Sequence, residues 1–339
     1  MKLIAMYNTF EEKDKNFRLL PKVETIDKLN ELQDELSRKS EYRFRGVFQA
    51  KYHMLTSLQR LCPKEISNND YMRGLLTNVK GDSTIKKFFE DNNIYINDLS
   101  CLSLMQHLGM PTPLLDFTID INIALSFAAE DADINDHIIE TDDYCSLYYF
   151  NLSEETEISD ANVQNVLATS INEEEKKCVE FIQNNPNASL DDSILREINN
   201  FVTWDDLASL EIAFVEYQRL ATQVRTLDYQ ELDITNSNLL NQKGVFVINQ
   251  FDDKIPLEEN WNMRTNNSRK KLASSLPSGS SLPFSGIYTK EKISCVNINK
   301  KVILEWKQQH HIELYDNSKG FKALEKRLCA IKDNYNKSV

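Results

Sequence analysis

Two changes of pattern fall within the stretch Gln106-His107-Leu108-Gly109-Met110-Pro111-Thr112-Pro113-Leu114-Leu115-Asp116-Phe117-Thr118. Gly109 follows a helical apolar pattern, in the place where a glycine closes a helix in the left-handed conformation. Pro111 and Pro113 then prevent a new helix and force the chain into an extended form. The apolar run from Leu114 to Phe117 is typical of a short buried strand. The stretch therefore predicts a helix, a tight loop and a strand in close succession.

Helices are predicted on both sides of this stretch. Apolar residues at helical spacing predict a helix over about 98–108, with Asn97 as its N-cap. A second helix is predicted over about 120–130, capped by Asp120 or Thr118. Similar spacing predicts further helices over 22–39, 66–97 with an interruption near Gly81, 301–309 and 318–332.

Alternating or fully apolar runs predict the strands. They lie at 42–48, 114–117, 146–150, 244–248 and 287–298. Because helices alternate with strands in the first part of the chain and again near its end, we expect an α+β fold. Its helices are expected to pack around a central mixed sheet.

The segment 151–240 differs in composition from the rest of the chain. It is acidic, contains no glycine and has a mostly helical pattern, with breaks near Pro186 and Trp204. We therefore expect a helical insertion over 151–240, within a domain formed by residues 1–150 and 241–339. The helices of about 155–235 are expected to pack beside the core and to leave most of the functional cleft to other residues. Their acidic face is either solvated or a contact for a partner protein.

The bulk composition restricts the classes of function. The chain has 339 residues and a formal net charge of −13, which gives no support to nucleic-acid binding. No apolar run is long enough for a transmembrane helix, and the apolar start is too short for a signal peptide, so we expect a cytoplasmic protein without a membrane partner. The six cysteines are scattered, and the five histidines lack metal-ligand spacing. Neither a metal site nor a disulfide framework is expected.

Four separated motifs resemble the FRG domain family. They are Phe44-Arg45-Gly46, Leu55–Arg60, the stretch 106–118 with the following Ala124–Ala128, and Gln242–Phe246. Two residues depart from the family pattern. The arginine of the family's proline-threonine-arginine block is Pro113 here, and its tryptophan is Phe117.

The pattern is also similar, more loosely, to that of ADP-ribosyltransferases. In that resemblance Arg45 stands on the first characteristic strand, Thr118 leads into the helix after the second, and Gln242 begins the third. It implies that NAD is the cofactor and dinucleotide substrate, bound by Arg45, Gly46, Gln106 and Thr118. The catalytic residues it implies are Arg45, His107, Asp116, Thr118 and Gln242. The implied protein is an NAD-cleaving transferase, of the kind used as a toxin or in phage defence, with an acceptor that the sequence does not indicate.

The chemistry of NAD cleavage suits most of these residue types. An arginine binds a pyrophosphate through two N–H groups, and a hydroxyl orients the ribose. Breaking the glycosidic bond develops oxocarbenium-like charge, which a carboxylate stabilises. Gln242 has no negative charge, so Asp116, Glu211 or Glu216 supplies the carboxylate. Otherwise the chain is a nucleotide-binding sensor or interaction module without turnover.

Each candidate also has a structural interpretation. Arg45 is either a ligand for the dinucleotide or a buried structural partner of the Asp116 carboxylate. Asp116 and Thr118 are equally suited to capping the following helix, and His107 to capping the helix that ends at Gly109. Gln106 is expected to bond to the proline loop. We predict that Arg45, Gln106, His107, Asp116 and Thr118 line one cleft, because unusual residues from separate motifs commonly converge on one site.

Overall fold

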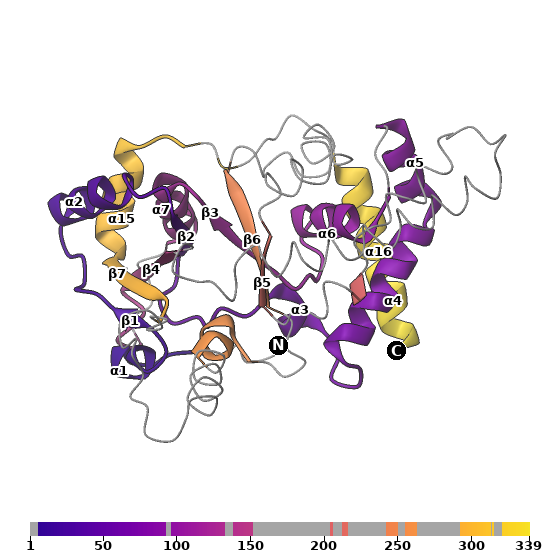
Figure 1. Ribbon diagram of the computed structural model, residues 1–339, viewed down its shortest axis with the longest axis horizontal. Coiled ribbons are helices and arrows are strands. Elements are labelled where there is room, and N and C mark those ends of the chain that lie inside the picture. The colour runs from indigo at the N-terminus through magenta and orange to yellow at the C-terminus, as the bar shows by residue number, and fades with distance from the viewer. Residues whose placement is uncertain are drawn as a thin grey trace, which may run out of the picture. The chain divides into compact units, whose positions relative to one another are not determined.

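Segments far apart in the sequence fold together in the computed structural model, which describes residues 6–92, 96–132, 138–151, 204–205, 212–215, 242–249, 255–262, 292–312, 314 and 321–339. The chain divides into two units (Figure 1). The first consists of Met1–Leu55, Asp116–Thr156 and Lys254–Leu314. The second consists of Thr56–Leu115, Glu157–Asp253 and Tyr315–Val339. These boundaries differ from those of the three segments expected from the sequence.

The first unit is built on a mixed sheet. Its strands β1 and β7 are parallel, while β4 pairs antiparallel with both β7 and β2, and β2 pairs antiparallel with β3. Helices accompany this sheet, so the expected α+β class with a mixed sheet is confirmed. In spatial order the strands are β1 (Arg18–Leu19), β7 (Ser294–Asn299), β4 (Tyr144–Asn151), β2 (Tyr42–Val47) and β3 (Leu114–Thr118). The first two residues of β3 belong to the second unit.

The register of β2 against β4 gives the sheet two distinct faces. Phe44 lies opposite Tyr149, while Arg45 lies opposite Tyr148. Because side chains alternate along a strand, Phe44 and Tyr149 share one face and Arg45 and Tyr148 the other. The Phe44 face is apolar and packs against three helices. Figure 1 shows these helices beside β2, β4 and β7. These are α2 (Ile26–Leu36), α7 (Ile121–Glu130) and α15 (Lys300–Gln309).

Side-chain caps explain where these helices begin. Thr25 caps α2 and Asn299 caps α15, each accepting a hydrogen bond from a backbone N–H of the first turn. Of the two candidates for α7, Asp120 is the N-cap, and its carboxylate accepts from the Asn122 N–H at 2.9 Å. The short helix α1 (Phe10–Asp14) begins at the cap Thr9.

The second unit is mainly helical among its described residues. Its core is formed by the apolar faces of its helices together with Phe246 and Ile248. The described helices are α3 (Ser57–Leu61), α4 (Asn68–Gly81), α5 (Ser83–Asp91), α6 (Asp98–His107) and α16 (Lys322–Ser338). The expected interruption near Gly81 is therefore confirmed. So is the Asn97 cap of α6, which forms a reciprocal pair of hydrogen bonds with Ser100.

A strand pair in the second unit adds an element that the sequence did not predict. Strand β5 (Ile212–Val215) pairs antiparallel with β6 (Gly244–Asn249), within the segment 151–240 that was expected to be mostly helical. Strand β5 was missed because a short apolar run does not distinguish a helix from a buried strand. Apart from Asn151, 204–205 and β5, the expected insertion lies outside the described residues. The same holds for residues 287–291 of the strand predicted over 287–298, of which the structure describes β7.

Gly46 brings β2 against the backbone of α7. A Cβ atom at this position would lie 1.7 Å from the Ala124 carbonyl oxygen. We expect Gly46→Ala to destabilise the fold by at least about 3 kcal/mol, because neither backbone can move away without breaking its own hydrogen bonds. Urea denaturation measures this loss. Gly81→Ala is the matched control, because a Cβ there meets nothing within 4 Å. Equal stability of the two variants would contradict the close contact.

Asp82 joins three elements of the second unit. Its Oδ1 atom accepts from the backbone N–H groups of Thr84 and Ile85, at 2.9 and 3.2 Å, and so caps α5. Its Oδ2 atom accepts from Arg327 Nε on α16 at 2.7 Å. The hydrogen bond from Arg327, helped by the two amides, lowers the pKa of the Asp82 carboxyl below its ordinary value.

This lowered pKa predicts a pH-dependent contribution to stability. The ion pair stabilises the fold fully above the unfolded carboxyl pKa of about 3.9, and its contribution is lost as the pH falls through the lower folded value. Asp82→Asn keeps a good capping side chain, so we expect a loss of about 1 kcal/mol at neutral pH that disappears in acid. Urea denaturation across this pH range tests the expectation, with the exposed Asp91→Asn as control. A loss that persists unchanged in acid would contradict it.

Candidate functional site

Arg45 is held in a fixed orientation on a central strand of the first unit. Its Nη1 atom donates to the backbone carbonyl of Asp116 on β3 at 2.5 Å. Its guanidinium carbon lies 5.9 Å from the centre of the Phe117 ring. The side chain is half-buried. A planar guanidinium restrained by an acceptor and an aromatic ring has less freedom to lose when it binds an anion.

The neighbouring candidates in the first unit have structural roles. Gly46 provides the close approach of β2 to α7. Thr118 lies opposite Phe44 and is 1% exposed, and its hydroxyl oxygen accepts from the Asp120 N–H at 3.1 Å. Thr118 therefore supports the turn into α7, whereas Asp120 provides the cap.

Asp116 contacts Arg45 through its backbone. Since side chains alternate along β3, its carboxylate projects on the same face as Thr118, whereas Phe117 projects towards Arg45. The Asp116 group that receives the Arg45 hydrogen bond described above is the main-chain carbonyl. The geometry thus gives the Asp116 carbonyl a role in orienting Arg45.

The remaining candidates belong to the second unit. The Thr112 hydroxyl donates to Gln106 Oε1, which ties the end of α6 to the loop between the two prolines. The His107 ring meets the Phe321 ring edge-on, with 4.9 Å between the centres. Gln242 stands in the turn before β6. A single cleft joining these residues to Arg45 stays a prediction, and the candidate acids Glu211 and Glu216 lie outside the described residues.

Lys13, which no motif identified, lies at the centre of a buried polar cluster in the first unit. Its side chain is fully buried, and its ammonium donates to Ser146 Oγ at 2.7 Å and to the Ala50 carbonyl and Asn297 Oδ1, both at 2.9 Å. Burial lowers the pKa of Lys13. Three neutral acceptors thus satisfy the three N–H groups of this ammonium.

A buried carboxylate next to this cluster holds a histidine. Glu258 is 0% exposed and accepts from the Tyr7 hydroxyl at 2.8 Å and the Met54 N–H at 3.2 Å. Its Oε1 atom lies 3.0 Å from His53 Nδ1, a contact that is an ion pair only when the imidazole is protonated. The His53 ring stacks on Tyr7 with 3.8 Å between the centres. Glu258 and Tyr7 therefore fix the position of the imidazole.

The Lys13 cluster shares a sheet face with Arg45. Tyr148 on β4 lies opposite Arg45 on β2. Ser146, which is also on β4, lies opposite Asn297 on β7. Burial raises the pKa of Tyr148 well above its ordinary value, so this phenol stays protonated. Strand alternation predicts that Ser146 and Tyr148 share one face of β4, but only the register of β2 against β4 places Tyr148 opposite Arg45. Nothing in the sequence around Lys13 or Glu258 indicated that these charged residues are buried.

The geometry therefore defines an α+β unit whose mixed sheet presents Arg45 and a buried polar cluster on the same face. Residues 40–137, which include Arg45 and the stretch 106–118, match the FRG domain model, so this part of the chain is an FRG domain. No curated protein and no solved structure gives a significant match to the chain. Within the described residues, no helix is long and apolar enough to cross a membrane. No group of three histidine, cysteine or acidic side chains in this same part of the chain converges to hold a metal ion.

The Lys13 cluster makes a prediction about stability. Lys13→Met keeps most of the length of the side chain but removes three buried hydrogen bonds, and only Asn297 Oδ1 keeps another donor, the Ser146 hydroxyl at 2.9 Å. We therefore expect a loss of about 3 kcal/mol. Urea denaturation measures the loss, and Lys15→Met, at an exposed position two residues further on, is the control. If Lys13→Met and Lys15→Met had the same free energy of unfolding, the three hydrogen bonds would contribute little to stability and the prediction would be wrong.

Proposed function

We propose that the chain binds NAD through Arg45 and cleaves it at the nicotinamide glycosidic bond, in the manner of an ADP-ribosyltransferase. The observation that carries this proposal is the presentation of Arg45. It is half-buried on a central strand, oriented by the Asp116 carbonyl, and its guanidinium carbon lies 5.9 Å from the centre of the Phe117 ring. Such a guanidinium suits a pyrophosphate, whose oxygens accept two parallel hydrogen bonds from a planar fork.

The same face supports a role in proton transfer. Cleavage releases nicotinamide, and water or an acceptor group then adds to the anomeric carbon and gives up a proton. His53 is held by the Glu258 carboxylate at 3.0 Å and by stacking on Tyr7. An imidazole oriented by a carboxylate is a general base suited to neutral pH. With cleavage, the chain would act as an NAD-consuming effector of the toxin or phage-defence type.

A second candidate function is binding without turnover. Gln242 and Pro113 favour it, because the resemblance to ADP-ribosyltransferases and to the FRG family places a carboxylate and an arginine at these two positions. A glutamine can hydrogen-bond the ribose but cannot neutralise oxocarbenium charge. A nucleotide sensor would use the same Arg45 and lack only the release of nicotinamide.

Arg45→Lys tests the role of the arginine, because lysine keeps the charge and loses the planar fork. We expect NAD affinity, measured by calorimetry, to fall at least about tenfold while the melting temperature is retained. Arg43→Lys is the control on the same strand and face. Arg43 donates to the carbonyls of Ser40 and Tyr42 and is 7% exposed, so its replacement should leave NAD affinity unchanged.

The release of nicotinamide from NAD by the wild-type protein separates the two functions. Binding with release supports cleavage, and binding without release supports the sensor. If wild-type protein binds neither NAD nor ADP-ribose at millimolar concentration, or if Arg45→Lys binds as tightly as wild type, Arg45 is a structural residue and the proposal is wrong.

A further inference from the structure

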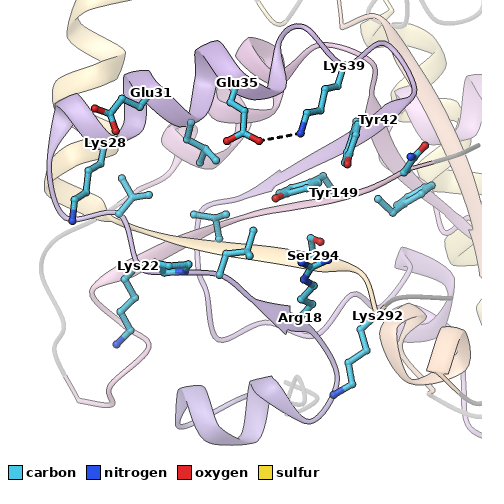
Figure 2. Close-up of a pocket in the computed structure, with 17 residues that line it drawn as sticks. Arg18, Lys22, Lys28, Glu31, Glu35, Lys39, Tyr42, Tyr149, Lys292 and Ser294 are labelled. Carbon is cyan, nitrogen blue, oxygen red and sulfur yellow. Dashed lines mark hydrogen bonds and ion pairs between the residues drawn. The ribbon is translucent and has the colours of Figure 1, made fainter. Parts of the chain in front are cut away.

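A groove opens in the first unit between α2 and one end of the sheet. It has a volume of about 560 Å³, within the range of ligand pockets, which is roughly 300–1,000 Å³. Figure 2 shows Glu35 and Lys39 on one side of it, Arg18 and Ser294 on the other, and the Tyr149 ring between them. Strands β1, β4 and β7 and helix α2 all contribute to its wall.

The groove is separate from the Arg45 site. Tyr149, which lines it, lies opposite Phe44 in the β2–β4 ladder, whereas Arg45 lies opposite Tyr148. Alternation therefore places the Tyr149 ring and the Arg45 guanidinium on opposite faces of the sheet, and Arg45 is not among the residues that line the groove. A ligand in the groove is a second ligand of the unit, independent of the function proposed for Arg45.

The groove is positively charged on a chain of net charge −13. Its lining includes five basic and two acidic side chains, a balance of 5 − 2 = +3. One acid, Glu35, is neutralised by Lys39 at 2.9 Å. The ammonium of Lys292 donates to a neutral partner, the Asp14 carbonyl, at 2.8 Å. The other basic residues of the lining are Arg18, Lys28 and Lys22. Lys22 is paired with Glu140, which lies outside the lining, at 3.4 Å, so it adds little to the charge of the groove.

Apolar and aromatic side chains complete the groove. Leu20, Val23, Leu32 and Val296 provide apolar surface. The Tyr42 and Tyr149 rings lie 5.5 Å apart with an angle of 55° between their planes. Burial raises the pKa of Tyr149 to about 12, so its hydroxyl remains a hydrogen-bond donor at neutral pH. Apolar surface, two ring faces and an excess of cations suit a molecule with a planar body and an anionic end.

We propose that this groove binds a small aromatic anion, in which a planar ring system carries a phosphate, sulfonate or carboxylate group. The ring would lie on the apolar wall beside Tyr42 and Tyr149, and the anionic group would face Arg18. Lys28, exposed on the first turn of α2, would add to the attraction. Because Arg18 stands on the short strand β1, occupation of the groove would join β1 to α2 through the ligand.

A matched pair of fluorescent probes tests the proposal. 8-Anilino-1-naphthalenesulfonate is an aromatic anion, and N-phenyl-1-naphthylamine has the same rings without the sulfonate. We expect saturable binding of the anionic probe at one site, at least about tenfold tighter than that of the neutral probe. Arg18→Gln should remove most of this difference and Lys28→Gln part of it. Arg38→Gln, an exposed arginine outside the lining, should leave it unchanged.

Near-UV circular dichroism of each variant excludes unfolding as the cause of a change. Three results would overturn the proposal: no saturable binding of the anionic probe, equal affinity for both probes, or an Arg18→Gln protein that binds the anion as wild type does. NAD binding is measured separately with Arg45→Lys. The proposal for the groove and the proposal for Arg45 can therefore each be disproved independently of the other.

Discussion

The close approach of β2 to α7 is the constraint on which the first unit depends. At Gly46 the strand comes so near the Ala124 carbonyl that no side chain fits between them. With that contact made, Phe44 and Tyr149 are buried under α2, α7 and α15. Because side chains alternate along a strand, Arg45 then projects from the opposite face of the sheet. The packing of the apolar layer thus determines the face on which Arg45 is presented. In the Arg45-Gly46 pair, the glycine allows the close contact with α7 and the arginine projects from the other face.

The two faces of this sheet differ in chemistry for the same reason. The face opposite the helices contains Arg45 together with the buried side chains of Lys13, Tyr148 and Glu258. Buried charges are costly unless they are paired or fully hydrogen-bonded, and the acceptors around Lys13 and the donors around Glu258 meet that condition. Such a network holds its members in one arrangement, which is what a binding or catalytic face requires.

Local elements were predictable from the sequence because their signals are local. The cap at Asn97, the left-handed Gly109 with φ of 70° and the break beside Gly81 all follow from residue type and spacing. The roles of side chains were harder to predict, because they depend on pairing across the sheet. The sequence left open whether the Asp116 carboxylate pairs with Arg45, and the contact with the Asp116 carbonyl could be found only from the pairing of β2 with β3. Lys13 and Glu258 come from segments about 245 residues apart, and no sequence pattern joins them.

The central claim is that Arg45 is presented on this face to bind a phosphate of a dinucleotide. A crystal structure of the wild-type protein grown with millimolar ADP-ribose tests it most directly. The account predicts that the pyrophosphate lies within hydrogen-bonding distance of the Arg45 guanidinium, which keeps its contact with the Asp116 carbonyl. An ordered ADP-ribose bound elsewhere, with Arg45 contacting only protein atoms, would contradict it.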